Sequence, residues 1–379
     1  MKSQILSEEI QFAHWLRQTK KNTWAKVLAF LSRDALPTLY PEIFPIPPEV
    51  TAASSQGWTN LCLFIVREDK KAFVLRGRPL GEGEDFRSVA YNKEAFILKT
   101  LRGKVPVAEV PEQPVTQGTL EGAPFGSGKQ FVFMLQERLD GVPASELNLP
   151  FKEREWLLIQ LGQTARAIHS INVDSFGPNF CVPKPGTIRE RQGDFYNSVL
   201  ALMRIDWLVS RGALDAVTAG FVRDRVELLK RAALKTDLYH NDFAYNWSNV
   251  LIDPSTRRLT GIIDWEFAGV GAAIYQEFSS LVYPAVRDGV SFRKASRALS
   301  HFLVGYGMSQ EEFEVGHRFH FDTYLLIQAV QALRKYEELR ESNQSSCEPW
   351  RRLFAVRARN LLDFLCHSPR DRTKIALER

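Results

Sequence analysis

The sequence predicts an α+β fold made of a small β-rich lobe followed by a larger, mainly helical lobe. Between Trp58 and Glu137, runs of β-branched and aromatic residues alternate with turn signals, which is typical of strands. After Gly141 the apolar residues recur at helical spacing instead. With 379 residues, 45% of them hydrophobic, the chain has enough apolar material for one large domain or two smaller ones. We therefore expect three segments, which are an extension over 1–50, the small lobe over 51–137 and the helical lobe over 138–379.

Charge and cysteine content exclude several classes of protein. The formal net charge of +5 comes from 49 basic and 44 acidic residues without a long basic block, so a nucleic-acid partner is not expected. The 4 cysteines are too scattered for a disulfide framework or a CxxC metal site, which suggests a reducing compartment. The N-terminus has no apolar signal segment, and no apolar run approaches the roughly 18 to 20 residues needed to span a bilayer. We expect a cytoplasmic protein with no membrane partner.

The first 137 residues contain helical stretches, a proline-rich linker and then strand-like runs. Two helices are predicted over 8–18 and 23–33, and the proline-rich residues 36–50 prevent their continuation. The predicted strands are 59–68, 72–77, 105–110 ("VPVAEV") and 129–137. A helix between them carries Glu94, Ile97, Leu98 and Leu101. A β-rich unit with one helix is typical of a small nucleotide-binding lobe.

The rest of the chain is predicted to be mainly helical. Four apolar residues share one helix face at spacings of four, four and three, namely Leu157, Leu161, Ala165 and Ile168. Residues 323–336 and 353–366 show the same amphipathic pattern. Between His240 and Gly269 the pattern changes to two short apolar strands, "VLID" and "LTGIID", joined by "PSTRR". We expect a β-hairpin carried inside the helical lobe.

Polar side chains gather at the ends of this hairpin. Asp242 and Asn249 precede the first strand, and Asp264 ends the second. Side chains at neighbouring strand ends converge, and a carboxylate and an amide oxygen that converge on one point are suited to Mg²⁺, which usually shares its oxygen ligands with substrate phosphates. A further carboxylate nearby can orient an attacking hydroxyl and accept its proton. The set indicates phosphoryl transfer.

Each of these residues also has an ordinary structural explanation. Asp and Asn at strand ends are common turn formers, so any one of them is more often a cap than a catalytic group. The joint order is more specific, because it requires His-x-Asp, then Asn before an apolar strand, then Asp at the close of the next strand. The combination therefore favours a functional site.

The stretch "HNDFAYNWSNVLID…GIIDWEFAG" resembles the aminoglycoside phosphotransferase and choline kinase-like family of small-molecule kinases, which has a two-lobed protein-kinase-like fold. The resemblance implies that Asp242 is the catalytic base or hydroxyl-positioning residue, that His240 is a brace of the catalytic loop, and that Asn249 and Asp264 are magnesium ligands. The family has four residues between the Asp and the Asn, whereas this chain has six. Asn249 is preferred to Asn246 because it directly precedes "VLID".

The resemblance covers most of residues 50–290 and extends to the nucleotide. It implies a nucleotide-covering turn at Gly57 and Asn60, an arginine in place of the family's strand lysine, a helix glutamate that pairs with this arginine, and a hinge whose backbone meets the adenine. The implied nucleotide-binding residues are Gly57, Asn60, Arg76, Glu94, Met134, Gln136, Glu137 and Arg138. Three of them have structural alternatives, because Arg76 could be a surface arginine, Glu94 a solvated helix residue and Met134 core filler.

The family resemblance implies an ATP-dependent phosphotransferase, with GTP as the alternative nucleotide, that uses Mg²⁺ and a small-molecule hydroxyl acceptor. The nucleotide and metal would lie in the cleft between the lobes. The acceptor would bind to helical segments near 180–235 and 290–350. The protein would be a monomer or a homodimer. The alternative is a catalytically silent nucleotide-binding or scaffold protein on the same fold, which the lengthened loop and Arg76 favour. A protein kinase is disfavoured, because GxGxxG, DFG and APE sequences are absent.

Overall fold

The computed structural model describes nine segments of the chain, which are 35–53, 61–79, 86–122, 126–178, 180–181, 185–232, 235–244, 246–287 and 292–341. The chain divides into two compact units. Unit 1 consists of Met1–Asp140 with Gly261–Glu266, and unit 2 consists of Gly141–Thr260 with Phe267–Arg379. The helices predicted over 8–18, 23–33 and 353–366, together with Gly57 and Asn60, lie outside the described residues.

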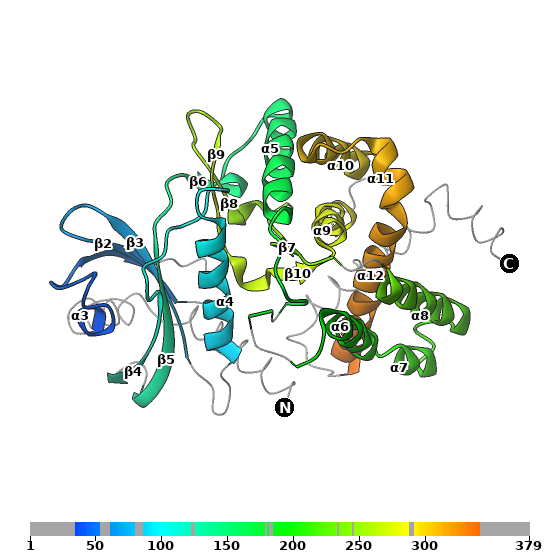
Figure 1. Cartoon of the computed structure of the whole chain (residues 1–379), viewed down its shortest axis with the longest axis horizontal. Coiled ribbons are helices and arrows are strands. Elements are labelled where there is room, and N and C mark those ends of the chain that lie inside the picture. Colours follow the sequence, from blue (N-terminus) through cyan, green and yellow to red (C-terminus); the bar gives the residue numbers. More distant parts are fainter. Residues whose placement is uncertain are drawn as a thin grey trace. The chain divides into compact units, whose positions relative to one another are not determined.

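Unit 1 is built on a five-stranded antiparallel sheet with the strand order β1-β2-β3-β5-β4. The strands are β1 (Glu49–Ala53), β2 (Leu61–Val66), β3 (Ala72–Pro79), β4 (Val115–Gly122) and β5 (Gly126–Glu137). Buried Leu36, Tyr40 and Phe44, on and after helix α3 (Leu36–Leu39), form one core with apolar residues of β2, β3 and β5. Helix α4 (Phe86–Leu101) packs against β4 and β5 (Figure 1). The sheet and α4 thus position the residues of β3 and α4 toward each other.

The strand predicted over 105–110 is absent, so that prediction is wrong. The segment joins no ladder. Its backbone makes separate hydrogen bonds, in which the carbonyl of Pro106 accepts from Ile262 N at 2.9 Å and that of Glu109 accepts from Glu137 N at 2.7 Å. The apolar alternation of "VPVAEV" reflects burial of Val105, Val107 and Ala108 rather than strand pairing.

Unit 2 contains most of the helices. They are α5 (Phe151–His169), α6 (Ile188–Met203), α7 (Ile205–Ser210), α8 (Ala216–Arg231), α9 (Ala273–Arg287), α10 (Phe292–Tyr306), α11 (Gln310–Gly316) and α12 (Arg318–Glu341), with a short 3-10 helix η2 (Ala144–Glu146) before them. The described residues of the predicted helix over 323–336 lie in α12. The α+β prediction, with strands first and helices after, is confirmed.

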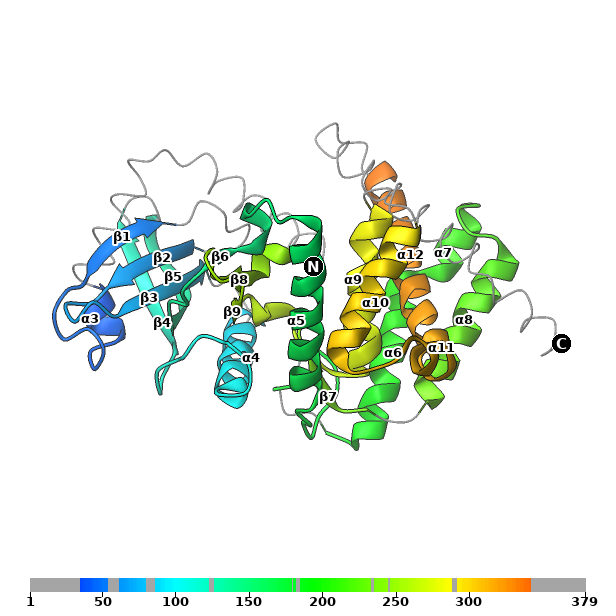
Figure 2. The same ribbon diagram turned by 90° about the horizontal axis from the view of Figure 1, so that it is seen from above.

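Helices α5 and α10 approach closely, and α9 lies beside α10 (Figure 2). Two glycines permit the approach. A Cβ at Gly305 would overlap the carbonyl of Ile159, and a Cβ at Gly162 would overlap the carbonyl of Phe302. Larger residues at these two positions would force the helices apart.

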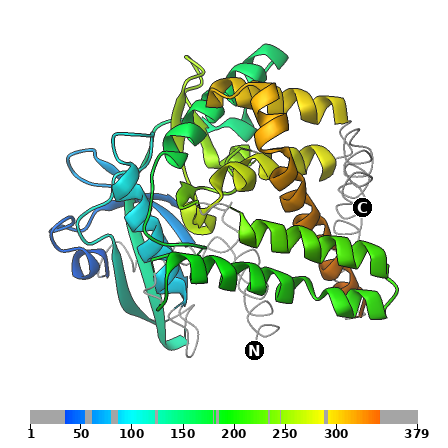
Figure 3. The same cartoon turned by 45° about the vertical axis from the view of Figure 1, so that its right-hand side comes forward.

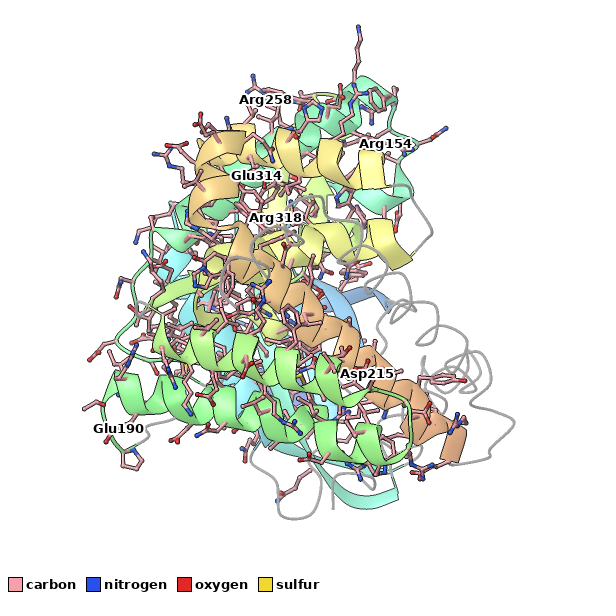
Figure 4. All side chains as sticks on the ribbon, turned by 90° about the vertical axis from the view of Figure 1, so that its right-hand side faces the viewer. Arg154, Glu190, Asp215, Arg258, Glu314 and Arg318 are labelled. Atoms are coloured by element: carbon pink, nitrogen blue, oxygen red, sulfur yellow. The ribbon has the colours of Figure 1, made fainter. Side chains whose placement is uncertain are left out.

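Helices α6 and α8 lie side by side, and α12 runs across them (Figure 3). Their shared core includes buried Tyr196, Val226 and Leu326. The hydroxyl groups of Tyr196 and Tyr324 are hydrogen-bonded at 2.8 Å, which satisfies both buried polar ends. Glu190 completes a capping box at the start of α6, and Asp215 caps α8 (Figure 4). These caps fix where both helices begin.

Short strands lie among these helices. Strand β7 (Asp237–Tyr239) pairs antiparallel with β10 (Gly269–Gly271), while β6 (Val142–Pro143), β8 (Val250–Ile252) and β9 (Leu259–Ile262) form a three-stranded sheet in that order. His240 follows β7 directly, so the strand fixes where the polar loop starts. Among the helices in the described part of the chain, none is both long and apolar enough to cross a membrane.

Candidate active site

The loop after β7 holds one carboxylate between two other side chains. His240 is fully buried, and its Nδ1 lies 2.9 Å from Oδ1 of Asp242. Nδ2 of Asn249 lies 3.2 Å from both carboxylate oxygens of Asp242. A carboxylate only accepts hydrogen bonds, so the amide of Asn249 must present its NH₂ group to Asp242. The amide oxygen of Asn249 therefore faces away from Asp242.

Two backbone hydrogen bonds lie between Asp242 and Asn249. Asn246 N donates to the carbonyl of Asp242 at 2.8 Å, which closes one turn, and Asn249 N donates to the carbonyl of Asn246 at 2.8 Å. The second turn is the 3-10 helix η3 (Trp247–Asn249), and Trp247 Nε1 donates back to Ala244 O at 3.3 Å. These hydrogen bonds bring Asn249 back toward Asp242, and the amide of Asn249 reaches that carboxylate.

Glu277 on α9 binds the backbone of this loop. Its Oε2 accepts hydrogen bonds from the backbone N–H of Asn241 at 2.9 Å and of His240 at 3.2 Å. Neighbouring Gln276 donates to the side chain of Asn241 at 2.7 Å, and Asn241 has a φ of 96°, which is unusual for a residue other than glycine. Burial raises the pKa of Glu277 to about 7 against the opposing effect of His240 and the two N–H groups. Two adjacent α9 residues therefore hold the loop that carries Asp242.

In unit 1 a buried arginine is surrounded by carboxylates. Arg76 on β3 pairs with Glu94 on α4 at 2.5 Å, and its other terminal nitrogen lies 3.2 Å from Oδ1 of Asp264 and 3.9 Å from Oε2 of Glu266. The guanidinium also lies 5.6 Å from the ring centroid of Tyr91. Burial opposes its charge, but Glu94 and Asp264 outweigh that effect and hold the pKa of Arg76 well above its ordinary value. Arg76 is therefore a fixed cation.

The end of β5 was predicted to meet the adenine. Met134 is fully buried opposite Arg76 in the register of β3 and β5. Gln136 is also buried. The backbone N–H of Glu137 donates to Glu109 O at 2.7 Å, and that of Arg138 donates to Ala72 O at 2.9 Å. These two N–H groups already have protein acceptors, so an adenine contact at this segment would use its other backbone groups.

The predicted residues fall into two groups. Unit 1 brings together Arg76, Glu94 and Asp264, and unit 2 brings together His240, Asp242 and Asn249. The joint use of Asn249 and Asp264 by one Mg²⁺ stays a prediction.

Sequence reasoning missed Glu277. The available signal was an acidic residue at the start of a helix with no other charge nearby, "IYQEFSSLV", shortly after the hairpin. An acid in such a place needs a partner, because burial of an unpaired charge is costly.

The sequence profile of the phosphotransferase enzyme family, abbreviated APH, matches residues 50–313. The match spans well over half of the 379 residues. The chain belongs to this phosphotransferase enzyme family. The matched range includes both residue groups described above, so the family profile covers the candidate site as well as the fold.

Solved structures similar to this phosphotransferase-family chain include two of the aminoglycoside phosphotransferase APH(4)-Ia, both thermostable mutants. The complex with ADP and hygromycin B is 16% identical, covers 89% of this chain and 99% of that chain, and has a TM-score of 0.58. The complex with AMP-PNP and hygromycin B is 16% identical, covers 90% and 99%, and has a TM-score of 0.55. Both support the kinase-like fold. A comparison with curated proteins gave no match.

Proposed function

We propose that the protein is an ATP-dependent phosphotransferase that transfers the γ-phosphate to a hydroxyl group of a small molecule. The observation that carries the proposal is the carboxylate of Asp242, which accepts a hydrogen bond from the amide of Asn249 at 3.2 Å and lies 2.9 Å from Nδ1 of His240. In this role Asp242 orients the acceptor hydroxyl and accepts its proton. The amide of Asn249 bonds both oxygens of Asp242, so little reorganisation of this carboxylate would be needed when the acceptor binds.

Magnesium would be held by the amide oxygen of Asn249 and the carboxylate of Asp264. The donor chemistry fits, because Mg²⁺ prefers oxygen ligands and usually takes one or two from the protein and the rest from phosphates and water. The amide oxygen of Asn249 faces away from Asp242, and the Asp264 side chain is 38% exposed. Bound magnesium would neutralise charge on the phosphates. Among the described residues, no group of three or more His, Cys, Asp or Glu side chains could hold a metal.

Arg76 would supply a second, fixed positive charge for the phosphates. Its pairing with Glu94 at 2.5 Å supports this role, because a buried arginine held by a carboxylate cannot swing away. Catalysis by such a set is electrostatic and positional, since phosphoryl transfer requires little covalent participation by the protein.

We propose that the acceptor is a small molecule with a hydroxyl group. The candidates are aminoglycosides, choline-like compounds and related metabolites. The structural neighbour APH(4)-Ia was solved with hygromycin B, which places an aminoglycoside-type antibiotic first in the panel. ADP in the same neighbour supports an adenine nucleotide, with GTP as the alternative to be tested.

The experiment is a thermal-shift titration with ATP and Mg²⁺, followed by an assay of acceptor-dependent ATP consumption over this panel. The proposal expects nucleotide stabilisation and turnover with at least one hydroxyl acceptor. A scaffold protein is the second candidate, and arginine at the position of the family's strand lysine is the observation that favours it. Nucleotide binding without turnover over a broad panel would support the scaffold instead.

A further inference from the structure

Lys93 on α4 is a buried cation that the proposed reaction does not use. Its exposed fraction is 4%, although lysine is among the residues least often buried. Its Nζ donates a hydrogen bond of 2.7 Å to the backbone carbonyl of Glu266. A buried ammonium group needs such partners, so the contact contributes to why Lys93 can be buried at all. The contact ties α4 to the segment that carries Asp264.

The next residue of α4, Glu94, binds the same segment. Oε1 of Glu94 accepts a hydrogen bond from the backbone N–H of Trp265 at 3.3 Å, in addition to its pair with Arg76. Lys93 and Glu94, which are consecutive on α4, thus bond the carbonyl of Glu266 and the N–H of Trp265. We refer to Lys93 and Glu94 together as the α4 clamp.

The clamped backbone needs such restraint. Asp264 has a φ of 66°, in the left-handed region that residues with a side chain rarely adopt. Such a conformation persists only where the surroundings hold it. Trp265 adds a further anchor, because it is fully buried and its indole N–H donates to Ile262 O at 3.1 Å.

We propose that Lys93 is a positioning residue for magnesium. Together with Glu94 it fixes the backbone of Asp264–Glu266 and so sets the direction of the Asp264 carboxylate. This inference rests on the proposed function, in which Asp264 is a magnesium ligand. Lys93 bonds the backbone at Glu266, two residues from Asp264, so its effect on the metal is exerted through the backbone.

The same helix offers a matched control. Lys99 also donates from Nζ to a backbone carbonyl at the same distance of 2.7 Å, but this contact is exposed and its acceptor is Glu112 rather than a residue of the Asp264 segment. Lys93→Met and Lys99→Met therefore each remove one lysine-to-carbonyl bond from α4. Lys93→Gln, which keeps a polar end but is too short to reach the carbonyl, provides the comparison if Lys93→Met does not fold. Lys93→Arg keeps a charged donor and tests rescue.

The experiment measures ADP binding by calorimetry over a series of Mg²⁺ concentrations and with chelator. In Lys93→Met or Lys93→Gln, the Mg²⁺ concentration that gives half of the metal-dependent gain in affinity should rise about tenfold, the size expected for one lost charge-assisted hydrogen bond. Binding in chelator should stay unchanged. Lys99→Met should match the wild type, and Lys93→Arg should recover most of the loss.

A second readout requires no nucleotide. Amide hydrogen exchange of the peptide that spans Ile262–Phe267 should become faster in Lys93→Met than in the wild type and stay unchanged in Lys99→Met, because the clamp restrains that backbone. Unchanged exchange there, or an equal shift of the magnesium requirement in Lys93→Met and Lys99→Met, would overturn the role of Lys93 alone. Wild-type protein that binds ADP with no dependence on Mg²⁺ would overturn the proposed function together with the inference.

Discussion

Glu277 gives a prediction whose size follows from its surroundings. The carboxyl group is fully buried, and its burial raises the pKa from 4.5 to about 7, with a further increase from Asp242 and an opposing effect of His240 and the two backbone N–H donors. Because the folded-state pKa lies above the unfolded value, the folded protein binds more protons between these two values. The contribution of Glu277 to stability is therefore fully present below pH 4.5 and is lost as the pH rises through about 7.

The magnitude follows from the two pKa values. Their difference corresponds to about 3 kcal/mol of unfolding free energy that Glu277 removes from the protein as it ionises. Glu277→Gln keeps the shape and an acceptor oxygen for Asn241 N–H but does not titrate. Relative to the wild type, the unfolding free energy of the variant should rise by about 3 kcal/mol as the pH increases from roughly 4.5 to 8.

The assay is equilibrium urea unfolding of both proteins over this pH range. The quantity compared is the difference between the two unfolding free energies at each pH, so that other titrating groups, among them His169 with its pKa lowered to about 3 by burial, cancel. Glu277→Ala, which removes the acceptor as well as the charge, should be less stable than Glu277→Gln at every pH. A pH-independent difference between wild type and Glu277→Gln would show that Glu277 does not titrate with a raised pKa in the folded protein.

Two further predictions concern a buried ion pair and a close helix contact. Arg76→Ala and Glu94→Ala should each cost about 3 to 5 kcal/mol of unfolding free energy, because each leaves a buried charge without its partner. The double variant should lose clearly less than the sum of the two single losses. Fully additive losses in urea unfolding would contradict a stabilising interaction between Arg76 and Glu94. Gly305→Ala should destabilise by about 1 to 3 kcal/mol through overlap with Ile159. Gly220→Ala on α8, where a Cβ meets open space, should instead stabilise by about 0.5 to 1 kcal/mol, and similar thermal unfolding of both variants would contradict the packing argument.

Local patterns predicted the fold class, and they singled out candidate site residues that lie together within each unit. The periodicity of Leu157 and Leu161 specifies α5, and the residue types around the turn at 69–71 specify the β2–β3 hairpin, since both signals depend only on near neighbours in sequence. The choice of Asn249 over Asn246 rested on the strand that follows it. That strand also fixes Asn249 in the structure, where its amide reaches Asp242.

Features that depend on distant parts of the chain could not be predicted. The segment 105–110 has the composition of a strand, but strand formation requires a partner, and no ladder forms at this segment. Lys93 looks like an ordinary surface lysine in "YNKEAF", but it is buried and its Nζ bonds the carbonyl of Glu266, which lies 173 residues further along the chain. The role of Glu277 is equally hidden, because its partners lie 36 and 37 residues earlier in the chain.

In the proposed reaction, Asp242 positions and deprotonates an acceptor hydroxyl. The most direct measurement is the rate of acceptor-dependent ATP consumption in Asp242→Asn, with an acceptor identified from the panel and with ATP and Mg²⁺ saturating. The substitution keeps size and hydrogen-bonding capacity but removes charge and basicity, so ATP binding should survive while turnover falls by about 10² to 10⁴-fold. A rate equal to that of the wild type, with ATP binding intact, would contradict the assignment of Asp242 as the catalytic base.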